Sequence, residues 1–503
     1  MLKQEWKRLK SGTDIRGVAV ETESGAEVTL TDDVVSRIAC GFAKWLSEKK
    51  NKPVTQLKIS IGHDSRISAD RVREAAANSL YDMGVTVFDC MLSSTPAMFM
   101  TTVELGADGA IMITASHHPF DRNGLKFFTR DGGLDSEDIS KILLYAQEND
   151  FNLDECGAII GAAYMSIYCK RLREMICREI NDENDYDQPL KGFKIVVDAG
   201  NGAGGFYATE VLEPLGADIT GSLYLEPDGY FPNHIPNPEN KQAMESIVRA
   251  TLDNNADLGI IFDTDVDRAG CVDKNGKEIN RNALVALASV IALENNEGGT
   301  VVTDSITSSG LKDFIENELK GKHHRFKRGY RKVINESLRL NSEGVNSPLA
   351  IETSGHAAFR DNYFLDDGAY LITKIVIKTA LMGKQGKTIG DLISALRQPL
   401  ESAEVRMNIL KDDFADYGNT VIEKLKQYAK DNSMPLAPEN YEGVRIEVDG
   451  GWMLLRLSVH DPIMPLNIES DYEGGVKALA EKFYEFIKNF DGIDASPLNE
   501  LIK

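Results

Sequence analysis

Short apolar runs that each end in a polar loop recur along this chain and restrict the folds open to it. Four of them occupy residues 57–62, 109–113, 193–197 and 258–262. Patterns with a helical period lie between such runs, for example at residues 32–49, where apolar side chains share one face. Strands that alternate with helices are typical of layered α/β proteins. The sequence therefore predicts a parallel α/β layer.

The length of the chain and its net charge limit the number of domains and the kinds of binding partner that we expect. A chain of 503 residues is too long for one core and suggests three or four domains. Its formal net charge of −22 argues against nucleic acid as a partner, because phosphate backbones require a basic surface, and also against anionic membranes. An acidic protein that binds an anionic ligand must concentrate basic side chains locally. The charge therefore limits a small-molecule ligand only weakly.

Cysteine usage and hydropathy indicate the compartment. The six cysteines are scattered without a CxxC or a zinc-site spacing, so we expect reduced thiols. Residues 1–10 hold no apolar segment of the signal-peptide type, and no apolar stretch approaches the roughly 20 residues that a membrane helix needs. We therefore expect a cytoplasmic protein with no membrane partner.

The loop after the apolar run 109–113 contains a serine, two histidines and a proline, in the order TASHHP at residues 114–119. A second short strand is predicted at residues 125–129. A serine hydroxyl at the mouth of a buried strand is rigidly placed and exposed, as a covalent phosphoryl carrier must be. The alternative interpretation of the loop, taken alone, is an ordinary polar turn. Ser116 is therefore a candidate nucleophile.

A second polar loop, DTDVDR at residues 263–268, follows the apolar run 258–262. Three carboxylates at alternate positions after a strand can converge on one hard cation, and such clustering is unfavourable without a metal. The glycine and closing glutamate of an EF-hand are absent, and the few ligands suit magnesium that shares its shell with a phosphate and water. A solvated acidic turn is the alternative, but the strongly apolar strand favours the metal site.

A glycine-rich loop follows the run 193–197 and contains Gly200, Gly202 and Gly205 in the spacing Gly-x-Gly-x-x-Gly. This spacing can indicate a dinucleotide site, which requires an acidic residue about 20 positions further on. Asp218 comes too early for that role, and Glu226 stands in a predicted turn. The loop is therefore interpreted as a close strand–helix junction, with the dinucleotide site as the weaker alternative.

Two of these loops, and a third segment near the N-terminus, resemble motifs of the α-D-phosphohexomutases, the phosphoglucomutase/phosphomannomutase superfamily. SGTDIRG at residues 11–17 is similar to the family's opening motif. TASHHP is similar to its phosphoserine loop, with His118 where Asn is usual. DTDVDR is similar to its metal loop, with Thr264 where Gly is usual. The motifs occur in the family's order.

Two further motifs extend the resemblance over nearly the whole chain. AIETSGH at residues 350–356 resembles the family's sugar-recognition loop, with Ala350 where Gly is usual. RLSVHDP at residues 456–462 resembles its phosphate loop, although Val-His-Asp replaces Gly-Thr-Glu. Tyr330 replaces the histidine that often ends another family loop. The altered phosphate loop is the largest departure from the family.

The resemblance implies an α/β fold of three similar mixed α/β domains and a smaller α+β C-terminal domain around a central cleft. The expected domains are a phosphoserine domain at residues 1–160, a metal-binding domain at 161–272, a sugar-recognition domain at 273–400 and a phosphate-binding domain at 401–503.

The resemblance also implies roles for individual residues. Ser116 would carry the phosphoryl group, Lys126 would act as acid/base, and His117 and Arg268 are further candidates for acid/base and charge-stabilising roles. Magnesium (Mg²⁺) would be held by Ser116, Asp263, Asp265 and Asp267. The implied substrate-binding residues are Arg16, Glu352, Ser354, His356, Arg456, Ser458 and His460.

The implied activity is the interconversion of hexose 1-phosphate and hexose 6-phosphate, of glucose or mannose, through phosphoserine and a bisphosphorylated sugar. A sugar bisphosphate would be the activator and a small sugar phosphate the binding partner. Three alternatives stay open: a phosphoglucosamine or acetylglucosamine mutase, a non-catalytic sugar-phosphate-binding relative, and a phosphatase. The preferred hexose, the oligomeric state and the phosphorylation state of Ser116 also stay open.

Overall fold

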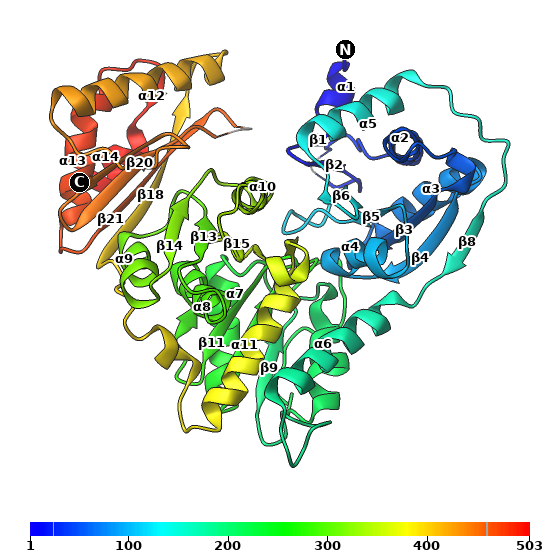
Figure 1. Cartoon of the computed structure of the whole chain (residues 1–503). Coiled ribbons are helices and arrows are strands. Elements are labelled where there is room, and N and C mark those ends of the chain that lie inside the picture. The colour runs from blue at the N-terminus through cyan, green and yellow to red at the C-terminus, as the bar shows by residue number, and fades with distance from the viewer. Residues whose placement is uncertain (24, 459–460) are drawn as a thin grey trace. The chain divides into compact units, whose positions relative to one another are not determined.

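The computed structural model describes residues 1–23, 25–458 and 461–503 (Figure 1). Two compact units divide the chain. The first unit contains Met1–Ala288 and Ser354–Leu392, and the second contains Ser289–Thr353 and Ile393–Lys503. Each unit therefore combines segments that are distant in sequence.

An eight-stranded mixed sheet forms the N-terminal part of the first unit, in the order β1-β2-β6-β5-β3-β4-β8, with β7 paired to β6. Neighbours among β5, β3, β4 and β8 are parallel, whereas β1, β2 and β6 pair antiparallel. The predicted α/β class with mixed sheets is confirmed. The strands are β1 (Lys10–Ser11), β2 (Asp14–Val18), β3 (Lys58–His63), β4 (Thr86–Leu92), β5 (Gly109–Ile113), β6 (Arg122–Thr129), β7 (Gly132–Gly133) and β8 (Ala158–Gly161).

Helices cover both faces of this sheet (Figure 1). α2 (Asp32–Lys50), α3 (Ala69–Asp82) and α5 (Ser136–Glu148) share one core with alternate strand residues such as Ile59 and Ile61. α4 (Thr95–Glu104) packs on the other face, where a side chain at Gly62 would meet Met98. α2 begins where the Thr31 hydroxyl accepts a hydrogen bond from the Val34 amide, as an N-cap does. Successive side chains of a strand point to opposite faces, so helices can pack on both sides of the sheet and hold it rigid. The loops that follow the parallel strands then leave the sheet at its carboxyl edge. A short helix, α1 (Gln4–Lys7), precedes β1.

The first unit also contains a second, four-stranded sheet, in the order β12-β11-β10-β9. The antiparallel pair β10–β11 is joined by residues 263–268, so the three aspartates leave the sheet at one edge. α6 and α11 lie side by side against this part of the unit (Figure 1). The elements are α6 (Tyr164–Ile180), β9 (Ile195–Asp198), α7 (Lys241–Asp253), β10 (Leu258–Phe262), β11 (Ala269–Asp273), β12 (Glu278–Ile279), β16 (Ala357–Phe359), β17 (Leu365–Asp366) and α11 (Gly368–Gly383).

The glycine-rich loop after β9 makes close backbone contacts. A Cβ atom at Gly202 would lie 2.7 Å from the carbonyl oxygen of Thr264 and 2.8 Å from its Cα. A Cβ atom at Gly205 would overlap the carbonyl of Leu225. Gly200 has φ +54°, a conformation that favours glycine. Gly202 therefore brings this loop against the backbone of the acidic loop, a contact that the interpretation as a strand–helix junction did not include.

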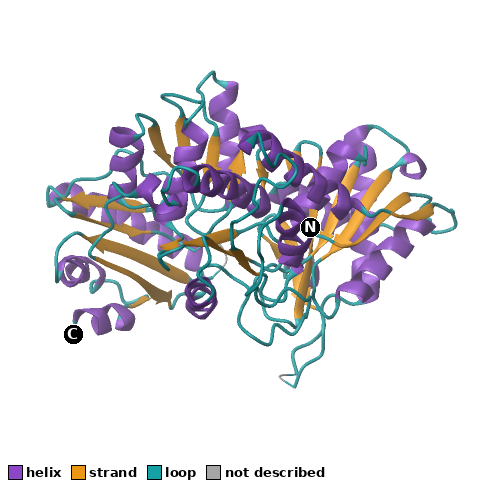
Figure 2. Cartoon of the chain, turned by 90° about the horizontal axis from the view of Figure 1, so that it is seen from below, coloured by secondary structure: helices purple, strands orange, loops and turns teal. Residues whose placement is uncertain are grey.

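The second unit contains a parallel sheet, in the order β14-β13-β15, and a separate antiparallel sheet, in the order β19-β20-β21-β18-β22. Figure 2 shows the chain coloured by secondary structure, with strands in orange and helices in purple. α8 (Asn282–Leu293) contains the boundary between the units. The other elements are β13 (Thr300–Thr303), α9 (Ser309–Asp313), β14 (Lys322–Arg325), α10 (Tyr330–Ser342), β15 (Leu349–Ile351), β18 (Glu401–Ile409), α12 (Phe414–Asp431), β19 (Val444–Val448), β20 (Gly451–Leu455), β21 (Ile463–Ser470), α13 (Gly475–Ile487), β22 (Ile493–Asp494) and α14 (Ser496–Ile502).

Two negative findings concern the described residues. Across the ranges given above, no helix combines the length and the apolar composition needed to cross a bilayer. Every cysteine in those ranges has a free thiol, and most of these thiols are buried. Burial raises the pKa of the Cys90 thiol to about 12, which keeps that thiol protonated and unreactive.

We expect Gly202→Ala to destabilise the first unit by about 1–3 kcal/mol, because the added methyl group meets backbone atoms of Thr264 that cannot rotate away. Gly161→Ala, also in the first unit, is the matched control, since a Cβ atom there has no neighbour within 4 Å. Chemical denaturation of both variants measures the difference. Equal stability of Gly202→Ala and wild type would contradict the close contact.

Candidate active site

Ser116 lies in the loop between β5 and β6, where its hydroxyl faces the acidic loop of the second sheet. Its Oγ donates to Oδ2 of Asp263 at 3.1 Å and accepts from Nη2 of Arg268, also at 3.1 Å. The residue is buried and has φ +52°, a left-handed conformation that is unusual for serine. Two sequence-distant loops therefore meet at this hydroxyl, as the resemblance predicted.

The acidic loop holds three buried carboxylates together. Asp263, Asp265 and Asp267 each offer an oxygen within 4.8 Å of the others, and all three are at most 1% exposed. Burial, followed by repulsion from Asp267 and Asp265, raises the pKa of Asp263 well above its usual range. Asp267 behaves differently: burial opposes ionisation, but Lys126, His356 and Arg268 together lower its pKa. The cluster is therefore an electrostatically unfavourable arrangement that a cation would relieve.

Two carboxylate oxygens of this cluster fit a metal ion. Oδ1 of Asp265 and Oδ1 of Asp267 are buried and have no hydrogen-bond partner among the described residues. A buried carboxylate oxygen without a partner is unfavourable unless a cation binds it. Oxygen-only ligands are those that Mg²⁺ and other hard divalent cations prefer. The residues present therefore suit such an ion.

Lys126, on the strand that follows the serine loop, forms ion pairs with two aspartates of the acidic loop. Its Nζ donates to Oδ2 of Asp265 at 2.8 Å and to Oδ2 of Asp267 at 2.5 Å. The lysine lies on β6 and is only 4% exposed. The register between β5 and β6 pairs Lys126 with Met112, so the sheet fixes its position. Lys126 therefore lies directly beside two carboxylates of the acidic loop.

Arg268 and His117 complete the surroundings of the serine. Nε of Arg268 donates to Oδ2 of Asp263 at 3.1 Å, and its Nη2 lies 2.7 Å from Nδ1 of His117. Since a guanidinium can only donate, Nδ1 of His117 is the acceptor. Partial desolvation, followed by the charge of Arg268, lowers the pKa of His117, although the residue as a whole is exposed. Its Nδ1 already accepts from Arg268, which weakens its candidacy as a proton donor.

His356 reaches the same cluster through the loop after β15. A β-bridge pairs His356 with Arg268, and Gly355 lies against the backbone of Ala269 so closely that a Cβ atom would be 2.6 Å from its carbonyl oxygen. Nδ1 of His356 is 2.6 Å from Oδ2 of Asp366 and 3.8 Å from Asp267. Burial opposes protonation, but these two carboxylates raise the pKa of His356 to about 9. His356 is therefore a cation beside the acidic loop.

Arg16 lies near the serine loop but outside its hydrogen-bond network. It is on β2, where Gly124 of β6 is its register partner, and its Nη2 is 2.9 Å from Asp14. After burial, the charge of Arg16 is the next cause that lowers the pKa of His118, to about 3. The arginine therefore adds positive potential beside the loop.

Glu352 and Ser354 of the sugar-recognition motif belong to different units, because the boundary falls between Thr353 and Ser354. Oε1 of Glu352 accepts a hydrogen bond from the Gly329 amide at 2.5 Å. In the same unit, the Thr353 hydroxyl donates to Oδ2 of Asp304 at 2.7 Å. Ser354 is buried. The motif is thus held by the backbone and by a carboxylate that the sequence did not single out.

The phosphate-loop residues are described in part. Arg456 follows β20, is 8% exposed, and its Nε has no hydrogen-bond partner in the described ranges. Burial, then the like charge of Arg328, lowers the pKa of Arg456. Oγ of Ser458 accepts from the Asp461 amide at 3.3 Å. His460 lies outside the described residues. The carboxylates of Glu442, Glu404 and Asp304 act on Arg456 in the opposite direction, and Oε2 of Glu404 lies 3.9 Å from its Nη2.

Sequence reasoning missed three residues that hold the site together. Thr95 donates from its hydroxyl to Oδ2 of Asp265 at 2.5 Å and from its amide to the Asp265 carbonyl at 2.9 Å. Asp366 orients His356, and Asp64 accepts from Thr114 in the serine loop. Asp366 begins an Asp-Asp-Gly sequence at residues 366–368, which follows the sugar-recognition motif and was a usable signal. Thr95 gives no signal, because it is one residue of an ordinary helix start.

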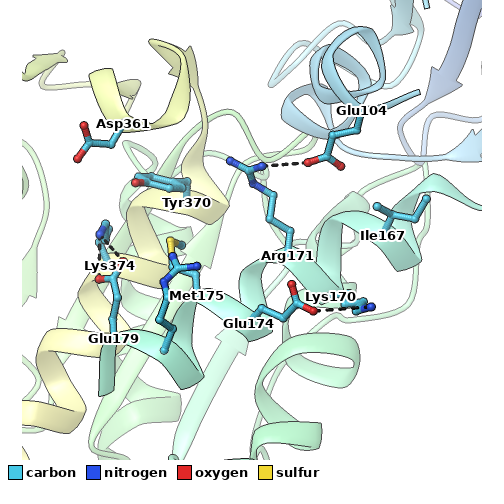
Figure 3. Close-up of a pocket in the computed structure, with 11 residues that line it drawn as sticks. Glu104, Ile167, Lys170, Arg171, Glu174, Met175, Glu179, Asp361, Tyr370 and Lys374 are labelled. Carbon is cyan, nitrogen blue, oxygen red and sulfur yellow. Dashed lines mark hydrogen bonds and ion pairs between the residues drawn. The ribbon is translucent and has the colours of Figure 1, made fainter. Parts of the chain in front are cut away.

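A pocket of about 560 Å³ lies elsewhere in the first unit, beside α6 and α11 (Figure 3). Arg171 donates to Glu104 at 2.9 Å, and Nζ of Lys374 lies 2.8 Å from Glu179. These cations are therefore already neutralised. Of the predicted site residues that the structure describes, none lines this pocket.

The comparisons with known proteins agree with this fold. Residues 7–153, 168–276 and 280–400 match "Phosphoglucomutase/phosphomannomutase, alpha/beta/alpha domain" I, II and III, respectively. The chain is 28% identical to a phosphomannomutase/phosphoglucomutase of Pseudomonas putida, over 85% of this chain and 86% of that one. It is 27% identical to a phosphoglucomutase of Neisseria gonorrhoeae, over 95% and 96%.

A crystal structure of a phosphoglucomutase/phosphomannomutase family protein from Burkholderia thailandensis superposes with a TM-score of 0.79, 25% identity and coverage of 97% of this chain and 98% of that one. Layered α/β domains with a serine opposite a buried acidic triad define the class of protein. The family matches cover well over half of the sequence. The chain belongs to the phosphoglucomutase/phosphomannomutase family, and the predicted resemblance is confirmed.

We expect Mg²⁺ or Mn²⁺ to raise the thermal unfolding midpoint of the protein, because an ion that binds only the folded state stabilises it by about 2.7 kcal/mol at 100 times its Kd. Asp265→Asn should weaken this effect at least tenfold in ion concentration. Asp218→Asn, at a half-exposed carboxylate of the same unit, should leave it unchanged. Ion titrations followed by differential scanning fluorimetry test this. Equal ion dependence of Asp265→Asn and wild type would contradict the metal site.

Asp304 should make the stability of the second unit depend on pH. Burial, followed by repulsion from Glu352, raises its pKa to about 7 from the ordinary 3.8. Between these values the folded state holds a proton that the unfolded chain releases, so the contribution to stability falls as pH rises from about 4 to about 7. Relative to wild type, Asp304→Asn should therefore become more stable from pH 5 to pH 8 in denaturant titrations. A difference that does not change with pH would refute the assignment.

Proposed function

We propose that this protein is a phosphohexomutase that interconverts hexose 1-phosphate and hexose 6-phosphate of glucose or mannose. The single observation that carries this proposal is the position of the Ser116 hydroxyl, 3.1 Å from both Asp263 and Arg268 at the buried acidic triad. Binding a sugar phosphate requires neither a nucleophile nor a metal site, whereas phosphoryl transfer uses both. The names of the matched relatives support hexose phosphates as the substrate class.

In the proposed reaction, phospho-Ser116 gives its phosphoryl group to a hydroxyl of the bound sugar monophosphate. The bond between Ser116 Oγ and phosphorus breaks and a bond from phosphorus to the sugar oxygen forms, while the proton of the sugar hydroxyl is passed, through the acid/base group, to Ser116 Oγ. The bisphosphorylated sugar then turns end for end, and its other phosphoryl group returns to Ser116. Arg268 already donates to Ser116 Oγ, so it is placed to stabilise charge that develops on that oxygen.

A divalent ion, which we propose to be Mg²⁺, would be held by Asp263, Asp265, Asp267 and the seryl phosphate. When bound, it neutralises charge on the transferring group. Lys126 is the proposed acid/base, since it is buried at the triad and carries exchangeable protons. His117 is the weaker candidate, because its Nδ1 already accepts from Arg268.

The residues proposed to bind the sugar phosphate are those of the family motifs. Glu352, Ser354 and His356 would contact ring hydroxyls, and Arg456 and Ser458 would bind the phosphate that is not transferred, with Arg16 and His460 as further contributors. A carboxylate that accepts from neighbouring hydroxyls can serve a sugar bound in either direction. A sugar bisphosphate would restore phospho-Ser116 after it is lost, and would therefore act as activator.

One assay distinguishes this proposal from its alternatives. The protein is incubated with glucose 1-phosphate, Mg²⁺ and a trace of glucose 1,6-bisphosphate. Formation of glucose 6-phosphate supports the mutase, release of inorganic phosphate supports a phosphatase, and an unchanged substrate supports a non-catalytic binder. The same assay with glucosamine and N-acetylglucosamine phosphates tests the amino-sugar alternative, and mannose 1-phosphate tests the hexose preference.

Ser116→Ala should lower turnover at least 10⁴-fold, because no other hydroxyl replaces the carrier. Its thermal unfolding midpoint should stay close to that of wild type, since only one hydroxyl is removed. Ser36→Ala, on α2 of the same unit, is the matched control and should keep full activity. Retention of turnover by Ser116→Ala would show that the phosphoryl group travels by another residue.

A further inference from the structure

Arg66, which follows β3, packs against the serine loop and directs both of its terminal guanidinium nitrogens, Nη1 and Nη2, to that loop. Its side chain is completely buried. Nε lies 3.3 Å from Oδ2 of Asp64, which is equally buried. Nη1 donates to the carbonyl oxygens of Pro119 at 2.7 Å and Arg122 at 2.8 Å, and Nη2 donates to those of His118 at 2.6 Å and Ser116. One guanidinium group therefore gathers four carbonyl groups of a single loop.

Asp64 adds a second connection to the same loop. Its Oδ2 accepts from the Thr114 hydroxyl at 2.6 Å, and that hydroxyl oxygen accepts from the Ser116 amide at 2.9 Å. Its Oδ1 accepts from the Arg66 amide at 3.0 Å. The amide and the carbonyl of Ser116 are thus both tied, through side chains, to the turn after β3. This turn belongs to the rigid parallel part of the sheet.

The conformation of Ser116 explains why such a connection is needed. A non-glycine residue at φ +52° is strained, and the strain persists only where the surroundings over-determine the backbone. Without the guanidinium, the buried carbonyl oxygen of Ser116 would lose this donor, and the half-buried one of His118 would lose it too, which is unfavourable. The loop would then relax toward a more ordinary conformation and move the Ser116 hydroxyl away from Asp263 and Arg268.

Gly229 and Phe231, which lie in the segment before α7, pack against Arg66. The Phe231 ring centroid lies 5.4 Å from the guanidinium carbon. Gly229 approaches so closely that a Cβ atom there would be 2.7 Å from the Arg66 carbonyl carbon. The guanidinium is consequently shielded from solvent and has no free face for a substrate. Its role is to hold the loop, which distinguishes it from Arg268, whose Nη2 contacts the serine hydroxyl.

We propose that Arg66 is the positioning residue of the serine loop, and that its guanidinium group fixes the Ser116 hydroxyl in the orientation required for phosphoryl transfer. This inference rests on the proposed phosphoserine mechanism. It assigns Arg66 to the chemical step, so its loss should lower kcat while leaving KM for the sugar phosphate nearly unchanged. Misplacement of a reacting group by about 1 Å can lower a rate about 100-fold.

The experiment compares Arg66→Lys and Arg66→Ala with the matched control Arg71→Ala. Arg71 lies in the same unit and also donates to two backbone carbonyls, those of Ala19 and Leu30, but not in the serine loop. We expect Arg66→Ala to lower kcat about 100- to 1000-fold and Arg66→Lys about 10- to 100-fold, with KM within about threefold of wild type. Arg71→Ala should keep kcat within about threefold.

Two further measurements separate positioning from a general loss of stability. Hydrogen exchange should become faster in residues 114–122 of Arg66→Ala and stay unchanged in β3 and in the acidic loop. A low, non-denaturing concentration of guanidinium chloride should restore part of the kcat of Arg66→Ala, because the free cation can occupy the vacated position. It should not raise the kcat of Arg66→Lys or of wild type.

The outcomes distinguish this inference from the proposed function. Wild type without isomerase activity would refute the proposed function, and the inference with it. Active wild type together with normal kcat in both Arg66 variants would overturn the inference alone. Loss of kcat in Arg66→Lys with unchanged hydrogen exchange at residues 114–122, or an equal loss in Arg71→Ala, would also overturn it.

Discussion

Mutual repulsion among three buried carboxylates is the constraint on which the site depends. Two like charges about 4 Å apart repel by about 4 kcal/mol even at an effective dielectric constant of about 20. The protein opposes this repulsion with Arg268 of the acidic loop itself and with Lys126 and His356, which come from two other segments of the first unit. The acidic loop therefore holds Lys126 and His356 in place, and these two residues in turn hold their own segments against it. The serine hydroxyl occupies the remaining position beside Asp263.

Several strands end at the site, and this fixes the positions of its residues. The serine loop follows β5, the aspartates follow β10, and the register of β6 fixes Lys126. Glycines then allow backbone segments to approach closely, as Gly202 does at Thr264 and Gly355 at Ala269. Rigid elements thus carry the charged groups, and small residues set the distances between the loops.

Much of the fold and part of the site could be predicted from the sequence. Apolar runs followed by polar loops predicted the strands and the α/β class, because strand periodicity is local. Ser116 and the three aspartates could be predicted because each loop carries its chemistry in a few consecutive residues. Arg66 and Thr95 could not, since their partners lie 50 to 170 residues away and depend on how the layers pack. For the same reason, the sequence did not indicate that the sugar-recognition motif is divided between two units.

The central claim is that Ser116 carries the transferred phosphoryl group. The most direct test is to incubate the protein with glucose 1,6-bisphosphate and Mg²⁺, to digest it, and to locate the added phosphoryl group by mass spectrometry. The account predicts one phosphoryl group on the peptide that contains Ser116, and its loss when glucose 1-phosphate is added. A phosphoryl group on another residue, or none while the protein isomerises glucose 1-phosphate, would contradict the account.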